Sequence, residues 1–179
     1  MQDEQSLVQR AQQHDQEAFA RLYEEYFDKI YRYIAFKIGN RVEAEDMTQQ
    51  VFVKALHSIS SYKWRGLPFS AWLFRIAHNQ VVDHLRKKTR RQVVSLNESL
   101  ISSGDNPHNI TEKKMDIEKL MKAARELTAA QQDVIHLRFS GDLPIAQVSK
   151  IMGRSEGAVK ALQHSAIVAL RKILNSGEV

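Results

Sequence analysis

The chain has 179 residues, of which 43% are hydrophobic and 26% are charged, a balance typical of a globular protein with a buried core. It contains no cysteine, which excludes disulfides, thiol nucleophiles and cysteine-ligated zinc. No stretch approaches the roughly 20 apolar residues of a membrane span, and the start Met1–Gln5 is polar. We therefore expect no membrane insertion and a cytoplasmic protein.

The net charge of +5 favours an anionic partner, and its distribution along the chain is informative. Residues 1–91 carry 15 Lys or Arg against 11 Asp or Glu, and residues 119–179 carry 9 against 5. The segment between them, residues 92–118, carries 2 basic residues against 5 acidic ones. This pattern indicates two units that bind nucleic acid, joined by a segment that does not.

Helical periodicity runs through the first half of the chain. Only seven glycines and three prolines are present, and apolar residues recur at spacings of three and four. We expect a short helix near Ser6–Gln13, then a long amphipathic helix that Asp15 caps and Gly39 ends. A third helix is expected over Val42–His57, with these residues facing inward: Ala44, Met47, Val51, Ala55 and Leu56.

The second half is also predicted to be helical, which makes the fold all-α. A fourth helix should begin near Phe69, after the loop Ser58–Pro68. Residues 92–111 have the composition of a flexible, acidic linker, and a capping box at Thr128 and Gln131 should open a later helix. The sequence therefore predicts two small helical domains, residues 1–91 and 112–179, joined by the linker 92–111.

The last segment has the pattern of a helix-turn-helix, a module that binds the major groove of duplex DNA. A helix near Ile145–Met152 is followed by Gly153 at a turn and by Ser155 as the cap of a long final helix. The residues at its start and on its polar side are the candidate DNA contacts: Arg154, Ser155, Glu156, Gly157, Lys160, Ala161, His164 and Arg171. The alternative is an ordinary helical hairpin whose polar face is only solvated.

Aromatic residues stand directly before a basic stretch of the fourth helix. Exposed aromatic rings can stack on unpaired bases while cations follow the phosphates, so this composition suits single-stranded nucleic acid. Tyr62, Trp64 and Phe69 are the expected stacking residues, and Gln80 is expected in the polar stripe of the helix. The full candidate set is Tyr62, Trp64, Arg65, Phe69, Arg75, His78, Asn79, Asp83, Arg86 and Lys87. Trp72, Leu73 and Ile76 are better explained as core residues.

Five segments in this order resemble the extracytoplasmic-function group of bacterial RNA polymerase sigma factors, of the sigma-70 family. Three are similar to the first conserved domain of that group and two to its second: Leu22–Arg32, Ala44–Phe52, Trp72–Arg86, Leu127–Arg138 and Gly157–Leu170. The chain departs from the group in having Leu162 and Ser165 where arginines are frequent, and a short apolar loop at Leu67–Phe69.

The resemblance implies a role for each segment. The helix with Glu45, Asp46, Gln49 and Gln50 would dock on core RNA polymerase. The stretch Tyr62–Lys87 would bind and open the promoter's minus 10 element, and the helix that begins after Ser155 would read the minus 35 element as duplex. The implied partners are core polymerase, promoter DNA and, as in many relatives, an anti-sigma factor. No catalytic residue, metal, cofactor or small-molecule substrate is implied.

Two other classes of function are compatible with parts of the sequence. A dimeric helix-turn-helix regulator would act without polymerase, with the N-terminal domain as its ligand-binding or dimerisation unit. An enzyme acting on DNA would need Asp83 with His84, or the acids Glu43, Glu45 and Asp46, as its reactive site. Because neighbouring residues of a helix point about 100° apart, Asp83 and His84 do not converge, and the acids are explained by the start of a helix.

Overall fold

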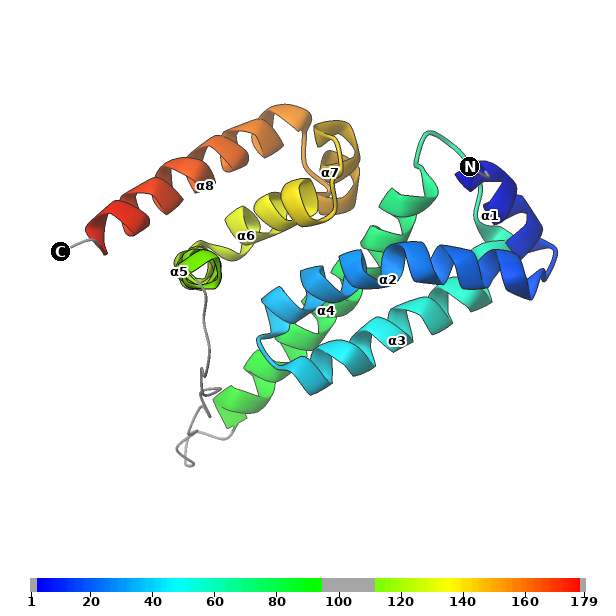
Figure 1. The fold of residues 1–179 in the computed structure, drawn as a ribbon, viewed down its shortest axis with the longest axis horizontal. Helices are drawn as coiled ribbons and strands as arrows, with labels where there is room; N and C mark the ends of the chain where they lie inside the picture. Colours follow the sequence, from blue (N-terminus) through cyan, green and yellow to red (C-terminus); the bar gives the residue numbers. More distant parts are fainter. Residues whose placement is uncertain (1–2, 95–111, 178–179) are drawn as a thin grey trace.

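The computed structural model describes residues 3–94 and 112–177, and every regular element in these two ranges is a helix (Figure 1). The all-α prediction is therefore confirmed. The N-terminal module, residues 3–94, contains α1 (Glu4–Gln12), α2 (Gln16–Ile38), α3 (Arg41–Ser58), the 3-10 turn η1 (Ile59–Ser61) and α4 (Phe69–Val94). The C-terminal module, residues 112–177, contains α5 (Glu112–Arg125), α6 (Ala129–Ile135), the π-helical turn η2 (His136–Ser140), α7 (Ile145–Met152) and α8 (Glu156–Ser176).

The ends of the N-terminal helices follow from local side-chain chemistry. The carboxylate of Asp15 accepts a hydrogen bond from Ala18 N at 3.2 Å and so begins α2. Gly39 ends this helix with a φ of +72°, a conformation that only glycine adopts without strain. Asn40 then caps α3 through the backbone N of Glu43. Each such cap typically stabilises a helix by about 1 kcal/mol.

The predicted signals of the C-terminal module are also present. Thr128 and Gln131 form a reciprocal capping box at the start of α6. Gly153 makes the turn of the helix-turn-helix with a φ of +63°, and the hydroxyl of Ser155 accepts a hydrogen bond from Ala158 N at 3.1 Å. The helix-turn-helix predicted from residues 145 onwards is therefore confirmed as local structure.

The core of the N-terminal module lies where α2 packs against α3 and α4. Leu22, Ile30 and Ile34 of α2 are fully buried, as are Val51 of α3 and Phe74 of α4. Fully burying one such side chain contributes roughly 1.5–3 kcal/mol relative to leaving it exposed. This packing fixes which side of α3 and which side of α4 face outward.

The two modules share one hydrophobic core instead of burying two separate ones. Val134, Leu137 and Val148 of the C-terminal module belong to the same buried cluster as Phe74. A second cluster joins Phe36 of α2 to residues of α5, α8 and the turn between α5 and α6. Figure 1 shows α7 beside α4, the pair of helices that brings the two modules together.

Two differences from the sequence-based expectations concern the facing of one side chain and the boundary of α4. Leu56, expected inside, is 50% exposed because α3 turns this position away from α2 and α4. Residues 92–94 of the predicted linker are the last residues of α4, and residues 95–111 lie outside the described residues. Within residues 3–94 and 112–177, no helix is long and apolar enough to cross a membrane.

Candidate nucleic-acid interface

The exposed face of α8 carries the candidate contacts for duplex DNA. Val159 and Ala166 are fully buried, and their burial fixes how α8 is rotated about its axis. The residues predicted on the opposite side are all exposed: Gly157, Lys160, Ala161, His164 and Arg171. Cations therefore lie beside small residues that allow a close approach, the composition expected of a helix that contacts phosphates and base edges.

Residues at the start of α8 stabilise the helix and are also predicted contacts for DNA. Ser155 holds the first turn through its bond to Ala158, and Glu156 complements the positive end of the helix dipole. Arg154 is exposed directly before the helix. Leu162, the residue that replaces a frequent arginine, packs against the core, so this position belongs to the buried side of α8.

The loop between η1 and α4 presents one aromatic ring to solvent instead of three. Trp64 is 46% exposed, whereas Tyr62 and Phe69 are 7% and 1% exposed. The hydroxyl of Tyr62 donates to Leu67 O at 2.7 Å, and its ring packs edge-on against Phe69 with centroids 6.0 Å apart. Tyr62 and Phe69, expected to meet bases, are therefore core residues here, because they hold the loop against the module.

The polar face of α4 is exposed along most of the predicted stripe. Arg65 of the preceding loop is also exposed, and the exposed residues of α4 are Arg75, Asn79, Asp83, Arg86 and Lys87. Arg86 pairs with Asp83 at 2.8 Å on the surface. The exposed amide of Asn79 offers both a donor and an acceptor to a base.

Two residues of α4 point inward instead: Gln80, which was expected in the stripe, and His78, which was a further candidate DNA contact. Gln80 is 8% exposed and donates to Gln50 Oε1 at 2.9 Å, so it ties α4 to α3. His78 faces α2, where its Nδ1 lies 2.9 Å from the hydroxyl of Tyr33. In sequence, both residues lie only one position away from the exposed stripe, so helical spacing alone does not determine which way they face. The packing of α4 between its neighbouring helices determines that both face inward.

The outer face of α3 is the candidate docking surface. Glu45, Asp46, Gln49 and Gln50 are all exposed, as predicted. The structure adds two apolar residues to this face, since Val53 and Leu56 are 52% and 50% exposed. The exposure of Leu56 could have been predicted from the sequence, because Leu56 follows Gln49 by two helical turns and therefore lies on the same side of α3. Exposed apolar groups beside acids suit a protein partner better than a phosphate backbone.

A buried polar cluster that sequence reasoning missed joins the two modules. Lys37 Nζ of α2 lies 2.8 Å from Asp133 Oδ1 of α6, and the two side chains are only 3% and 11% exposed. His78 Nδ1 lies 4.0 Å from the same carboxylate oxygen. Burial, reinforced by the negative charge of Asp133, raises the pKa of Tyr33 well above its ordinary value. The cluster is held together by groups from α2, α4 and α6.

Three further contacts surround this cluster. Lys150 Nζ of α7 donates to Gly66 O of the aromatic loop at 2.8 Å. The rings of Phe36 and His136 lie with their centroids 3.6 Å apart. At Gly141, an added Cβ would lie 3.0 Å from Cζ of Phe74, so α4 approaches the helix-turn-helix more closely than a side chain would allow. The contact between the modules therefore reaches from α2 to the loop before α4.

The buried histidines of this contact predict a dependence of stability on pH. Burial, together with the nearby Lys37 ammonium, lowers the pKa of His136 to about 4. Burial also lowers the pKa of His78, although Asp133 opposes the shift. The folded chain thus favours neutral imidazoles at these two positions. Below about pH 6.5 the unfolded chain therefore binds more protons than the folded chain. As a result, the free energy of unfolding falls as the pH is lowered from about 6.5 towards 4. For His136 the total loss is about 3 kcal/mol.

Urea unfolding of the wild type and of His136→Gln between pH 7 and pH 4 tests this dependence. The variant should lose less stability on acidification than the wild type. His57→Gln is the matched control because His57 is exposed on α3. Equal pH dependence in the wild type and His136→Gln would show that His136 is not responsible.

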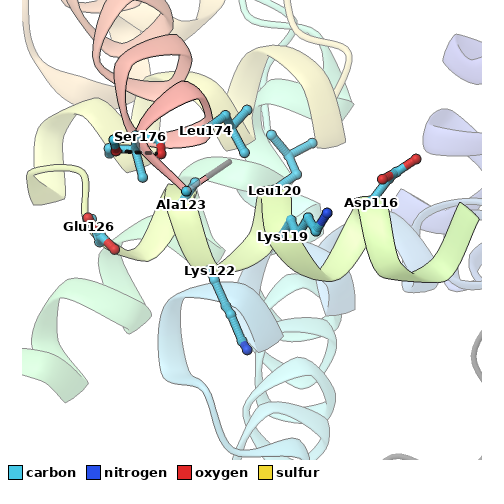
Figure 2. A pocket seen from close by; sticks show the side chains of 10 residues that line it. Asp116, Lys119, Leu120, Lys122, Ala123, Glu126, Leu174 and Ser176 are labelled. Atoms are coloured by element: carbon cyan, nitrogen blue, oxygen red, sulfur yellow. Dashed lines mark hydrogen bonds between the residues drawn. The ribbon is translucent and has the colours of Figure 1, made fainter. Parts of the chain in front are cut away.

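A groove with a volume of about 610 Å³ lies between α5 and the end of α8. Figure 2 shows Leu120 of α5 and Leu174 of α8 among its lining side chains, with Lys119 and Asp116 further along α5. None of its described lining residues was predicted as a site residue. Its mixture of apolar and charged groups suits a protein segment rather than DNA.

Comparisons with known proteins agree with this division into two modules. The family model described as Sigma-70 region 2 matches residues 22–91, and the model described as Sigma-70, region 4 matches residues 123–172. The first match covers α3 and most of α2 and α4, and the second covers α6, α7 and most of α8. Both candidate DNA-facing helices therefore lie inside matched regions.

Similar proteins and structures lead to the same group. The chain is 37% identical over 170 residues to the ECF RNA polymerase sigma factor BldN of Streptomyces coelicolor, covering 94% of this chain but 64% of that relative's length. It is 28% identical over 177 residues to the ECF RNA polymerase sigma factor SigW of Bacillus subtilis, with 93% of this chain and 94% of the relative covered.

The fold is also found in a solved structure. The sigma factor RpoE in complex with the anti-sigma factor NepR from Bartonella quintana matches with a TM-score of 0.76 at 23% identity, over 88% of this chain and 96% of that one. This likeness concerns the fold. With both region models matched in order, the chain belongs to the extracytoplasmic-function group of the sigma-70 family of RNA polymerase sigma factors.

Proposed function

We propose that this chain is a promoter-specificity subunit that binds core RNA polymerase and directs the initiation of transcription. The observation that carries the proposal is that one chain contains both sigma-70 regions, each with an exposed, cation-bearing helix face. Two different faces suit two forms of DNA, unpaired strand at α4 and duplex at α8. The chain itself performs no catalysis and acts in the cytoplasm, where the polymerase supplies the chemistry.

Each segment has its own task in this proposal. Residues 1–91 bind polymerase and the minus 10 element, and residues 112–179 bind the minus 35 element. Residues 92–111 form an acidic linker that follows the path of nucleic acid towards the polymerase active-site cleft. A further candidate partner is an anti-sigma factor, the kind of protein bound in the solved Bartonella quintana complex.

For the minus 10 element, Trp64 is the residue that stacks on an unpaired base. It is the exposed aromatic ring of the loop before α4, and its neighbour Arg65 is also exposed. Asn79 reads a base edge through its amide, and Arg75 with Lys87 binds phosphates. The buried Tyr62 and Phe69 support the loop that carries Trp64.

For the minus 35 element, the exposed side of α8 enters the major groove. Lys160 and Arg171 supply charge, and Gly157 with Ala161 permits the close approach of the helix. Arg154 binds a phosphate at the start of the helix. With few cations on this face, specificity at minus 35 depends strongly on each of them.

Lys160→Ala should therefore weaken the use of the minus 35 element by about 1–2 kcal/mol, or roughly 5- to 30-fold. The measurement is run-off transcription from paired templates with and without that element. Lys119→Ala is the matched control, since Lys119 is an exposed lysine of the same module on α5. An unchanged preference between the two templates would remove Lys160 from the reading face.

Run-off transcription with purified core polymerase tests the function as a whole. Added chain should direct initiation from a subset of a random promoter library. The alternative, a dimeric regulator that acts alone, predicts tight binding to palindromic DNA in a gel shift without polymerase. If the chain neither binds core polymerase nor changes the start sites of transcription, the proposal is refuted.

A further inference from the structure

A small groove lies beside Trp64, between α1 and the loop before α4. Its volume is about 190 Å³. Sites for drug-sized ligands measure roughly 300–1,000 Å³, so this groove has room for a single flat ring. We call it the α1 groove, and its lining residues come from α1 and from the loop: Gln5, Val8, Gln9, Gln12, Tyr62 and Trp64. The match to Sigma-70 region 2 begins at residue 22, so the α1 wall lies outside the matched region.

Three glutamines form the polar wall of the α1 groove. Gln5, Gln9 and Gln12 are spaced by four and three residues, so they lie on one face of α1. Gln12 donates to Ile59 O at 3.0 Å and to Tyr62 O at 2.7 Å, which fixes the loop to α1. Among the residues that the structure describes, the exposed side chains of Gln5 and Gln9 have no hydrogen-bond partner. Two amides are therefore available to a ligand.

The other walls suit the face of an aromatic ring. Val8 and Tyr62 are 3% and 7% exposed, so they give the groove an apolar floor. The exposed indole of Trp64 packs edge-on against Tyr62, with ring centroids 6.4 Å apart. Lys63 and Arg65, on either side of Trp64, are exposed and can bind phosphates. A base that stacks on the indole would thus have its backbone near two cations.

The polar groups of the groove match a base better than they match a cation. Its described lining residues include no acid, and Glu4, at the start of α1, is bonded to the hydroxyl of Tyr26 on α2. A glutamine amide carries one acceptor and one donor group side by side. Adenine presents the complementary pair, because its N6 amino group donates and an adjacent ring nitrogen accepts.

We propose that the α1 groove captures one unpaired adenine of the promoter, and that Gln5 and Gln9 read the edge of this base while Trp64 stacks on its face. The inference rests on the proposed function, which brings unpaired DNA to Trp64. It makes α1 a second determinant of sequence preference in the unpaired strand, separate from Asn79 on α4.

The test uses the full chain bound to core polymerase on a promoter selected from the random library. Its minus 10 region is unpaired in advance, which separates the capture of a base from the opening of the duplex. Adenine is placed at each unpaired position in turn and is then replaced by unsubstituted purine, which keeps the ring but lacks the N6 amino group. We expect one position at which this replacement weakens binding by about 10-fold.

Variants of α1 show whether the glutamines read that position. Gln5→Ala combined with Gln9→Ala removes both exposed amides, so the fold should remain and adenine and purine should bind equally well. Gln13→Ala is the matched control, because Gln13 is an exposed glutamine directly after α1 that does not line the groove. This control should keep the wild-type preference for adenine.

A second measurement needs no polymerase. The side-chain amide resonances of Gln5 and Gln9 in the isolated full chain are followed by NMR while a short oligodeoxyadenylate is added. Both resonances should shift, and the amide of Gln13 should not. An abasic oligonucleotide of the same length should shift neither, and Trp64→Ala should remove the response because the stacking face is lost.

The outcomes separate this inference from the proposed function. If the polymerase-bound chain binds the unpaired template but distinguishes adenine from purine at no position, or does so equally well without the two glutamines, the inference is wrong. An equal loss of preference in Gln13→Ala also overturns it. Amide shifts in a chain that never binds polymerase would refute the proposed function and leave the groove as a base-binding site. Without polymerase binding and without amide shifts, both are refuted.

Discussion

Reversal of Glu45 and Asp46 to lysine is expected to lower the affinity of the chain for core polymerase by about 3 kcal/mol, or roughly 100-fold. Both carboxylates are exposed on the outer face of α3, so the double variant changes the charge of the docking surface by four units, from −2 to +2 at these positions, without touching the core. Like charges brought together across an interface cost several kcal/mol. Co-purification with core polymerase at several salt concentrations measures the effect.

A matched variant makes this test specific. Glu24→Lys with Asp28→Lys changes the net charge by the same amount at two exposed positions of α2. It should bind polymerase like the wild type, and both double variants should keep their helical content. Equal losses in the two double variants would show that overall charge, rather than the α3 face, controls the association.

Trp64→Ala should impair the opening of promoter DNA by about 1–3 kcal/mol, or roughly 5- to 150-fold, because it removes the stacking of one base on the indole ring. The indole is 46% exposed, so its removal leaves the core intact. Permanganate reactivity of thymines near minus 10 reports the open complex directly. Polymerase association, measured in parallel, should stay at the wild-type level.

Trp64→Phe distinguishes stacking from a structural role of the loop. A phenyl ring keeps a face for a base to stack on, so this variant should recover most of the activity lost in Trp64→Ala. Equal loss of polymerase binding and promoter opening in Trp64→Ala would contradict the division of tasks between α3 and the loop before α4.

Much of the local structure could be predicted because its causes are local. Asp15, Gly39 and Ser155 each act on a neighbouring turn, so their residue types alone indicate where α2 and α8 begin or end. The exposed side of α8 followed from a rotation of 100° per residue, since Val159 and Ala166 had to be buried.

The remaining features depend on partners that lie far away in the sequence. Tyr62 and Trp64 are two positions apart in the same loop, and the packing of Tyr62 against Phe69 and Trp72 decides which ring is buried. Lys37 carried no sign that its partner would be Asp133, because α2 and α6 belong to different modules. Composition identified charges that suit DNA, but it could not identify charges that neutralise each other inside the protein.

The buried ion pair also constrains how this chain can evolve. Loss of either Lys37 or Asp133 alone would strand an unpaired charge in the interior, at a cost of about 3–5 kcal/mol, whereas apolar residues at both sites would be close to neutral. Inherited changes at positions 37 and 133 should therefore covary among descendants. A lineage that replaces both with leucine would keep the two modules in contact without the hydration cost of two buried ions.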